Sequence, residues 1–487
     1  MSDSGEQIAS RSGNDSRTKE YTRLVNEART KIECFIGIDP KDDVVLYTLN
    51  TSDAIGKLSL LCNFNETDLI LIPRMEHTSN FLPWLLKSGA TIIRIDQNLD
   101  GSINLQDLEE KLQLHHGNVR IVAFSGASNL TGTRPRIQEL VKIIKLSDSK
   151  TLVAVDCAQY APHFPMNKKD WGADFIYFSG HKLGAPNAPG VLAVPSEWLQ
   201  EKIPLIPGGG TVADILIEDD ELKPIWASEE AKYQPGTWPT LGIIELAGAI
   251  ETLNSLGWEE IVNREHELLV YAFKKFLLEI QGFRPLPVPS QSYEKMYLTP
   301  VLSFNLDGYT ADELSTHLAE NDIQHRGGSN DPICNHEYVR NVLNLNGIVR
   351  LSFCYHNTPE EIDRIGNLLA RLRLERPLTH NDDVLKIILG QDTKKLEELY
   401  IQRGKDNEVE ELCSRNLTHL EKDLKENLAL RELYCRFRDD FSFGELSQLN
   451  RRLEQIKNLS EKPATWRMYL TGLIACVMAS RGSEGSY

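Results

Sequence analysis

The chain has 487 residues with 53 Lys or Arg against 70 Asp or Glu, so its formal net charge is −17. Its apolar fraction of 41% and charged fraction of 25% are typical of a soluble globular protein and exclude collagen, coiled coil and wholesale disorder. An acidic chain without a basic run repels phosphate backbones, and no apolar stretch approaches the ~18–20 residues that span a bilayer. We therefore expect neither nucleic acid nor a membrane as a partner.

The N-terminal segment and the cysteines indicate the compartment. Residues 1–18 are rich in Ser, Asn, Asp and Gly, so we expect them to be disordered, and they lack the apolar core of a signal peptide. The 8 cysteines are scattered with no CxxC pair, which is typical of neither a disulfide framework nor a zinc site. These patterns predict a cytoplasmic protein without a metal centre.

Strand and helix signals alternate from about residue 44 to residue 373. Short apolar runs predict buried strands at residues 67–72, 91–95, 119–123, 151–155 and 174–178, with helices such as 105–112 and 137–144 between them. Strands that alternate with helices indicate an α/β fold with a mainly parallel sheet and helices on both faces. We assign this large domain to residues 19–258.

Two further segments follow the large domain. A long helical pattern near residues 260–280 precedes strands near 301–305 and 349–353, which predicts a smaller α/β domain over residues 259–376. Residues 377–487 carry leucines at helical spacing among many charged residues, so we expect a helical extension. Its simplest role is packing over the core, and a protein-partner site or a dimer contact are the alternatives.

One constellation carries the chemistry. Asp156 directly follows an apolar run, and ligands of open α/β sheets bind at the carboxyl ends of strands. Gln159 comes three residues later, and the next apolar run ends in Ser179-Gly180-His181-Lys182. This stretch, from Val153 to Lys182, resembles the signature of the class V aminotransferase family, which includes the cysteine desulfurases. That resemblance implies a pyridoxal 5′-phosphate (PLP) enzyme of fold type I, with an aspartate aminotransferase-like large domain.

The resemblance implies a role for each residue of the signature. Lys182 is the lysine that forms the Schiff base with PLP and moves the Cα proton of an amino-acid substrate. Asp156 pairs with the pyridine nitrogen and keeps it protonated, so that the ring acts as an electron sink. Gln159 contacts the phenolate oxygen of the ring, and Ser179 and His181 bind the phosphate.

Other segments agree with the family in chain order. Residues 75–80 followed by Pro83-Trp84 resemble the stretch whose His, here His77, stacks on the cofactor ring. Thr51 and Ser52 correspond to a phosphate-binding turn at a helix N-terminus, although an ordinary helix cap is the simpler interpretation of that pair. By the same resemblance, Asn129 is the asparagine that approaches the cofactor and the substrate.

Two more matches concern assembly and substrate. Gly236-Thr237 resembles the segment that reaches the phosphate in the neighbouring subunit, which implies a homodimer with shared sites. Arg350 resembles the arginine that binds the substrate carboxylate, a pairing in which the two groups form parallel hydrogen bonds. The N-terminal stretch before the first strand is shorter than is usual in the family.

The presence or absence of a sulfur-accepting cysteine distinguishes the possible reactions. Desulfurases carry a loop cysteine that receives sulfur as a persulfide, a step that requires a thiolate. Strict matching places Asp331 at that position, whereas a slightly longer loop places Cys334 there. We therefore expect a cysteine desulfurase that uses Cys334, or a C–S lyase that needs no cysteine. Transamination or epimerisation is the enzymatic alternative, and a non-catalytic scaffold that retains the fold is the other.

Overall fold

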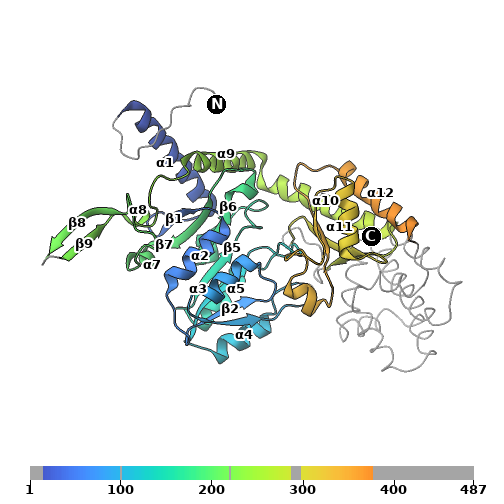
Figure 1. Ribbon diagram of the computed structural model, residues 1–487, viewed down its shortest axis with the longest axis horizontal. Coiled ribbons are helices and arrows are strands. Elements are labelled where there is room, and N and C mark those ends of the chain that lie inside the picture. Colours follow the sequence, from blue (N-terminus) through green and yellow to red (C-terminus); the bar gives the residue numbers. More distant parts are fainter. Residues whose placement is uncertain (1–14, 99–100, 219–220, 287–297, 377–487) are drawn as a thin grey trace, which may run out of the picture. The chain divides into compact units, whose positions relative to one another are not determined.

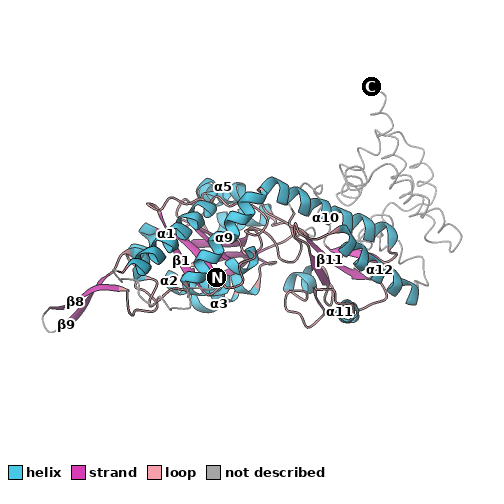
Figure 2. Ribbon diagram, turned by 90° about the horizontal axis from the view of Figure 1, so that it is seen from above, coloured by secondary structure: helices cyan, strands magenta, loops and turns pink. Residues whose placement is uncertain are grey.

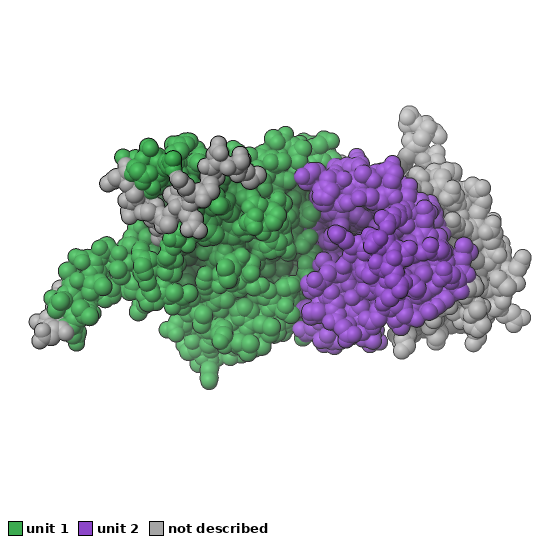
Figure 3. Space-filling model, turned by 45° about the horizontal axis from the view of Figure 1, so that its top comes forward, with its two compact units in different colours: residues 1–98, 103–129, 134–263 green, residues 99–102, 130–133, 264–487 purple. Residues whose placement is uncertain are grey.

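The computed structural model describes residues 15–98, 101–218, 221–286 and 298–376. These residues form two compact units (Figure 3). Unit 1 holds the residues up to Asn98 together with Ile103–Asn129 and Arg134–Asn263; unit 2 holds Leu130–Thr133 and the residues from Arg264 onward. The predicted disorder of residues 1–14 and the helical extension of residues 377–487 lie outside the described residues.

Unit 1 is built on a seven-stranded sheet in the order β1-β7-β6-β5-β4-β2-β3 (Figure 1). Strands β3, β2, β4, β5 and β6 run parallel to one another, and β7 is antiparallel to both of its neighbours. The predicted mainly parallel α/β fold is therefore confirmed. The strands are β1 (Asp43–Thr48), β2 (Leu69–Pro73), β3 (Thr91–Ile95), β4 (Val119–Ser125), β5 (Leu152–Asp156), β6 (Phe175–Ser179) and β7 (Gly190–Pro195).

Helices of unit 1 cover both faces of this sheet, as Figure 2 shows for α5 on one side and for α2 and α3 on the other. On the second side Ile55 and Trp84 pack with strand residues that include Tyr177. On the opposite side the Phe178 ring meets Phe35 of α1, with ring centroids 6.0 Å apart. The helices are α1 (Ser16–Ile36), α2 (Thr51–Cys62), η1 (Thr78–Asn80), α3 (Leu82–Lys87), α4 (Leu105–Leu114), α5 (Ile137–Ser147), α6 (Lys168–Trp171), η2 (Gly180–Leu183), α7 (Ser196–Gln200), α8 (Glu229–Lys232), α9 (Thr240–Leu256) and α10 (Trp258–Glu279), the last of which continues into unit 2.

The first helix begins earlier than the composition suggested. The Asp15 carboxylate accepts hydrogen bonds from the backbone N–H groups of Arg17 and Thr18, which satisfies donors that the helix itself cannot pair. Residues 16–18 are therefore the first turn of α1, and the prediction that they are disordered was wrong. A local cap outweighed the polar composition of the segment.

Unit 1 also carries a two-stranded hairpin, β8 (Val212–Glu218) and β9 (Glu221–Trp226), which extends away from the sheet (Figure 1). Its pairing places Ile217 opposite Leu222 and Ile215 opposite Pro224. Ile217 and Leu222 are 73% and 71% exposed. The sequence analysis did not predict this hairpin.

Unit 2 contains a four-stranded antiparallel sheet in the order β10-β11-β13-β12. The later part of α10 and the helices α11 and α12 bury a shared apolar cluster against it, with Phe276, Phe304 and Leu369 fully buried. The elements are β10 (Phe283–Leu286), β11 (Val301–Leu306), α11 (Ala311–Glu320), β12 (Arg326–Gly327), η4 (Tyr338–Val342), β13 (Val349–Ser352) and α12 (Pro359–Glu375). Across the described parts of both units, no helix is long and apolar enough to cross a bilayer.

Candidate active site

The predicted cofactor residues of unit 1 gather at the carboxyl edge of its sheet. Asp156 is the last residue of β5, and Ser179 is the last residue of β6, the neighbouring parallel strand. Asn129 is half-buried in the loop after β4, and His77 follows β2. The loops that follow parallel strands emerge at the same edge, which is the usual ligand site of open α/β sheets.

A group of hydroxyls surrounds the N-terminus of α2. The backbone N–H of Thr51 donates to Ser179 Oγ at 2.8 Å, and the two hydroxyl oxygens are 2.6 Å apart. The exposed Ser52 hydroxyl lies 2.6 Å from that of Ser79. Free amides and the dipole of a helix N-terminus favour a bound anion. The tertiary structure thus brings Thr51, Ser52 and Ser179 together, as a phosphate site requires.

Asp156 is the buried acid of this edge. Its carboxyl accepts a hydrogen bond from the Ala158 N–H at 2.8 Å, and it lies close enough to Lys182 for the two charges to interact. Burial raises the pKa of Asp156 to about 6, while that hydrogen bond and Lys182 lower it. A cationic ring nitrogen placed against this carboxyl would stabilise its ionised form.

Lys182 and His181 lie on η2, the short helix that begins directly after β6, and both side chains are exposed. Burial of the ring lowers the pKa of His181, and the nearby Lys182 charge lowers it further. Gln159, half-buried, lies with its amide nitrogen 3.5 Å from His163 Nε2. These three positions share the edge of the sheet with Asp156.

His77 adopts a defined ring state. Its Nδ1 accepts a hydrogen bond from the Ser79 N–H at 3.1 Å and caps η1. An imidazole nitrogen that accepts cannot carry a proton, so the proton of a neutral ring sits on Nε2. His77 therefore presents an N–H donor at that atom.

One functional candidate was missed in the sequence. Glu76 is buried, and its carboxylate accepts hydrogen bonds from the Ser125 N–H and hydroxyl at 2.8 and 2.6 Å, and from Asn80 Nδ2 at 2.7 Å. Its signal in the sequence was its place in the stretch of residues 75–80 that resembles the family. Because glutamates are ordinarily solvent-exposed, the sequence did not predict that this one would be buried.

Thr237 is distant in sequence from the site residues described so far and lies in an exposed loop before α9. It lines a pocket together with Tyr47, Gln234 and Trp238. Gln234 is buried, and its side-chain oxygen accepts a hydrogen bond from the Tyr47 N–H at 3.1 Å, which holds the start of this loop against β1.

The two predicted residues of unit 2 are neighbours of each other. Arg350 is half-buried on β13, and its charge influences the thiol of Cys334. Burial raises the pKa of Cys334 to about 12, the Asp331 charge raises it further, and the thiol is 0% exposed. Asp331 itself is engaged by Arg326 and by the N–H groups of Ile333 and Cys334.

This environment bears on the expected role of Cys334 as the sulfur nucleophile. A sulfur-accepting cysteine must be an accessible thiolate, but Cys334 is enclosed and protonated at neutral pH. The sequence placed Cys334 on a polar loop, and the structure buries the residue there. In this conformation the thiol is not exposed, and the role of Cys334 as a persulfide nucleophile stays a prediction.

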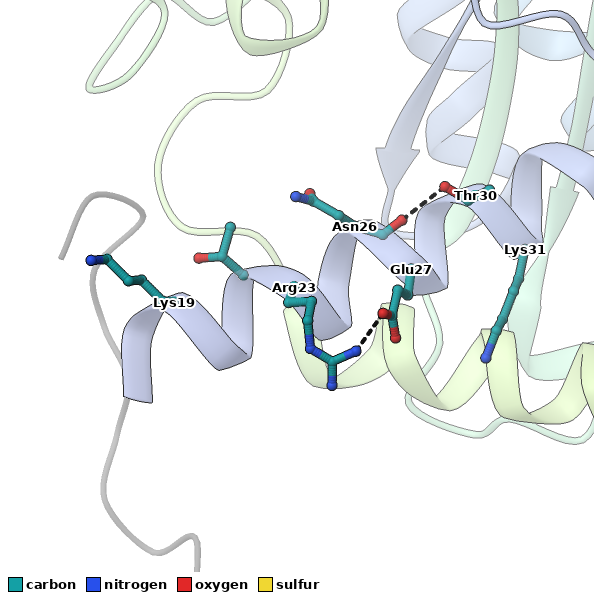
Figure 4. A pocket seen from close by; sticks show the side chains of 7 residues that line it. Lys19, Arg23, Asn26, Glu27, Thr30 and Lys31 are labelled. Atoms are coloured by element: carbon teal, nitrogen blue, oxygen red, sulfur yellow. Dashed lines mark hydrogen bonds and ion pairs between the residues drawn. The ribbon is translucent and has the colours of Figure 1, made fainter. Parts of the chain in front are cut away.

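A second hollow lies along α1 and is not part of this site. Figure 4 shows that its lining comes from a single helix, with Arg23 paired to Glu27 and the Thr30 hydroxyl donating to the Asn26 carbonyl. Because all of its lining residues lie on one helix, the hollow has no groups from a second element that converge on a ligand.

The residues present fit PLP. A hydroxyl-lined helix N-terminus suits a phosphate, a fully buried carboxyl suits a cationic ring nitrogen, and a lysine lies beside that carboxyl. In the described part of the chain, no group of three or more His, Cys, Asp or Glu side chains is placed to hold a metal ion. Fold and site together define a PLP-dependent enzyme class of fold type I.

Comparison with known proteins identifies the family. The class V aminotransferase model matches residues 5–365, so the chain belongs to that family, whose members depend on PLP. A probable cysteine desulfurase from Streptomyces coelicolor is 30% identical over 369 residues, which cover 73% of this chain and 83% of the relative.

Solved structures agree with the model. A cysteine desulfurase from Thermococcus onnurineus superposes with a TM-score of 0.64 at 29% identity, over 74% of this chain and 86% of the other. One from Escherichia coli gives 0.62 at 26% identity, over 74% and 87%. The predicted family, fold type and cofactor are therefore confirmed, and the enzyme is cysteine desulfurase-like.

Proposed function

We propose that this protein cleaves the C–S bond of cysteine or a close analogue by elimination, without transferring sulfur to Cys334. The observation that carries the proposal is the burial of that thiol, with a pKa of about 12, in a chain that belongs to the class V aminotransferase family. With cysteine the overall reaction is L-cysteine plus water giving pyruvate, ammonia and sulfide.

Three of the predicted site residues have a step in this scheme. Lys182 takes the proton from the substrate Cα, and the electron pair of that C–H bond forms the Cα–Cβ double bond as the Cβ–S pair leaves with sulfur. His77, with its proton on Nε2, is the donor to the departing sulfur. Arg350 binds the substrate carboxylate. PLP, when bound, supplies the electron sink that makes the Cα proton acidic.

Desulfuration is the second candidate, supported by the names of the relatives and by the position of Cys334 on the corresponding loop. It would require the loop to expose the thiol and would convert cysteine to alanine, with sulfur retained on the enzyme. The two reactions therefore differ in their organic product.

The test is a product assay on the purified protein with PLP and L-cysteine. The elimination proposal predicts pyruvate and sulfide in equal amounts, unchanged in Cys334→Ala and absent in Lys182→Ala. Alanine with a persulfide that disappears in Cys334→Ala would refute elimination and establish desulfuration. No turnover and no visible cofactor absorbance would leave a non-catalytic scaffold.

We also propose a homodimer. A two-stranded hairpin is marginally stable alone, and contiguous exposed apolar groups are typical of an interaction surface. The pair Ile217 and Leu222 on β8–β9 supports this assembly, since a second copy would cover it. Ile217→Lys should shift the mass from light scattering toward the monomer, whereas Leu146→Lys, at a position 76% exposed on α5, should not. A monomeric parent protein would refute the proposal.

The compartment is also a proposal. The described cysteines Cys34, Cys62, Cys157, Cys334 and Cys354 carry free thiols, which supports a reducing cytosol.

A further inference from the structure

The scheme above leaves one buried acid without a role. The Glu76 side chain is 4% exposed, and an ionised carboxylate at such a position is costly unless donors surround it. Three donors do so: two from Ser125 and one from Asn80. These donors offset part of the cost of ionising this buried group.

The direction of the hydrogen bond between Asn80 and Glu76 is fixed by the other partners of the Asn80 amide. Trp84 Nε1 can only donate, and it lies 3.3 Å from Asn80 Oδ1, to which the Tyr177 hydroxyl also donates at 2.7 Å. The oxygen of the Asn80 amide thus faces Trp84, and its nitrogen faces Glu76. Because that nitrogen also donates, the Glu76 oxygen opposite it must be an acceptor.

This network connects two parts of the cofactor site. Glu76 immediately precedes His77, and Asn80 ends the same turn, so both ends of the segment that carries the imidazole are tied to the sheet. At the other side, Ser125 is the last residue of β4 and pairs in register with Asp156 on β5. The carboxylate of Glu76 therefore bridges the segment of His77 and the neighbour of Asp156.

We propose that Glu76 is a positioning residue of the cofactor site: through Asn80 and Ser125 it fixes His77 relative to Asp156 and places a second acidic charge beside that residue.

The titratable groups around Glu76 determine how this charge acts. Asp156 faces it from β5 and Tyr177 from β6, while His77 is its neighbour on its own segment. Burial raises the pKa of Glu76 to about 7, the hydrogen bonds from Ser125 and Asn80 lower it, and the Asp156 charge raises it. Near and above neutral pH a negative charge at Glu76 favours the protonated, cationic form of a cofactor bound at Asp156.

The experiment follows the visible absorbance of the PLP-loaded protein as a function of pH, and needs no turnover. In Glu76→Gln we expect the titration midpoint to fall by about one pH unit, because a stabilising charge has been removed. Ser125→Ala is the matched control, since it removes one hydrogen bond to Glu76 but leaves the ionisable carboxyl in place, and its midpoint should fall by less than that of Glu76→Gln. An unchanged midpoint in Glu76→Gln, or an equal shift in both variants, would overturn the proposal.

The fixed orientation of the Asn80 amide allows a second test, which applies if Glu76→Gln binds PLP poorly. With its amide oxygen accepting from the Ser125 N–H, which cannot reverse, the introduced glutamine turns its amide nitrogen toward the amide nitrogen of Asn80. These are two donors in opposition as long as Trp84 holds Asn80 in place. Adding Trp84→Phe allows Asn80 to flip and accept. We therefore expect the double variant to bind PLP several-fold more tightly than the product of the two single effects predicts. Strictly multiplicative effects on the dissociation constant would refute the positioning role.

This inference rests on the cofactor site and not on the C–S chemistry. A failure to form pyruvate would refute the elimination proposal, and only the cofactor titration and the binding cycle bear on Glu76.

Discussion

Replacing Gly180 with alanine tests how the sheet positions Lys182. Gly180 is the first residue of η2, directly after Ser179, and its N–H donates to the Pro189 carbonyl at 3.0 Å. A Cβ built on it would meet Ala188 Cβ at 2.6 Å and the Pro189 oxygen at 2.8 Å. Real side chains do not approach so closely, so the end of β6 or the segment of Ala188 must move.

The expected cost follows from these contacts. Overpacking a tight core costs roughly 1–3 kcal/mol, and straining one backbone hydrogen bond adds up to about 1 kcal/mol. The lower chain entropy of alanine in the unfolded state returns roughly 0.4–1 kcal/mol. We therefore expect Gly180→Ala to reduce the free energy of unfolding by roughly 2 kcal/mol. Because the displaced segment leads directly into His181 and Lys182, PLP affinity should fall as well.

Gly184→Ala is the matched control. Gly184 has φ +89° and nothing within 4 Å of its added Cβ, so its cost is conformational alone, about 1 kcal/mol. Urea unfolding without added PLP gives both free energies, and spectroscopic titration gives the PLP dissociation constants. If Gly180→Ala costs no more than Gly184→Ala and binds PLP like the parent protein, close packing does not position the lysine.

Two further predictions concern buried charge. Burial raises the pKa of Asp156 to about 6, so the folded state binds the Asp156 proton more tightly than the unfolded chain does. The stability that this proton contributes is therefore present at low pH and is lost as pH rises from about 4 to about 6. Asp156→Asn should flatten the pH dependence of urea unfolding of the PLP-free protein over that window, and parallel curves would contradict this sign. Lys168 and Asp43 form an ion pair of 2.5 Å whose side chains are 7% and 10% exposed. Lys168→Met should destabilise by about 3 kcal/mol, and adding Asp43→Asn should recover part of that loss, whereas additive losses in a double-mutant cycle would argue against coupling.

Local patterns were sufficient for the sheet and for most of the site. Each strand predicted from an apolar run lies within two residues of an observed strand, because a strand buried on both faces must be apolar throughout. The signature residues Asp156 and Lys182 follow such strands, so strand direction alone brings them to one edge. The helix start at Ser16 was missed, because the single side chain of Asp15 determines it.

The sequence by itself determined the family, the parallel sheet and the residues at its carboxyl edge, since these depend on spacing along the chain and on the alternation of strands and helices. Only the tertiary structure decided the state of individual groups. Cys334 and Glu76 are polar or reactive residues in segments that look solvent-exposed, yet both are buried. Burial and hydrogen-bond partners come from distant parts of the chain, and they set the pKa on which the chemistry of a thiol or a carboxyl depends.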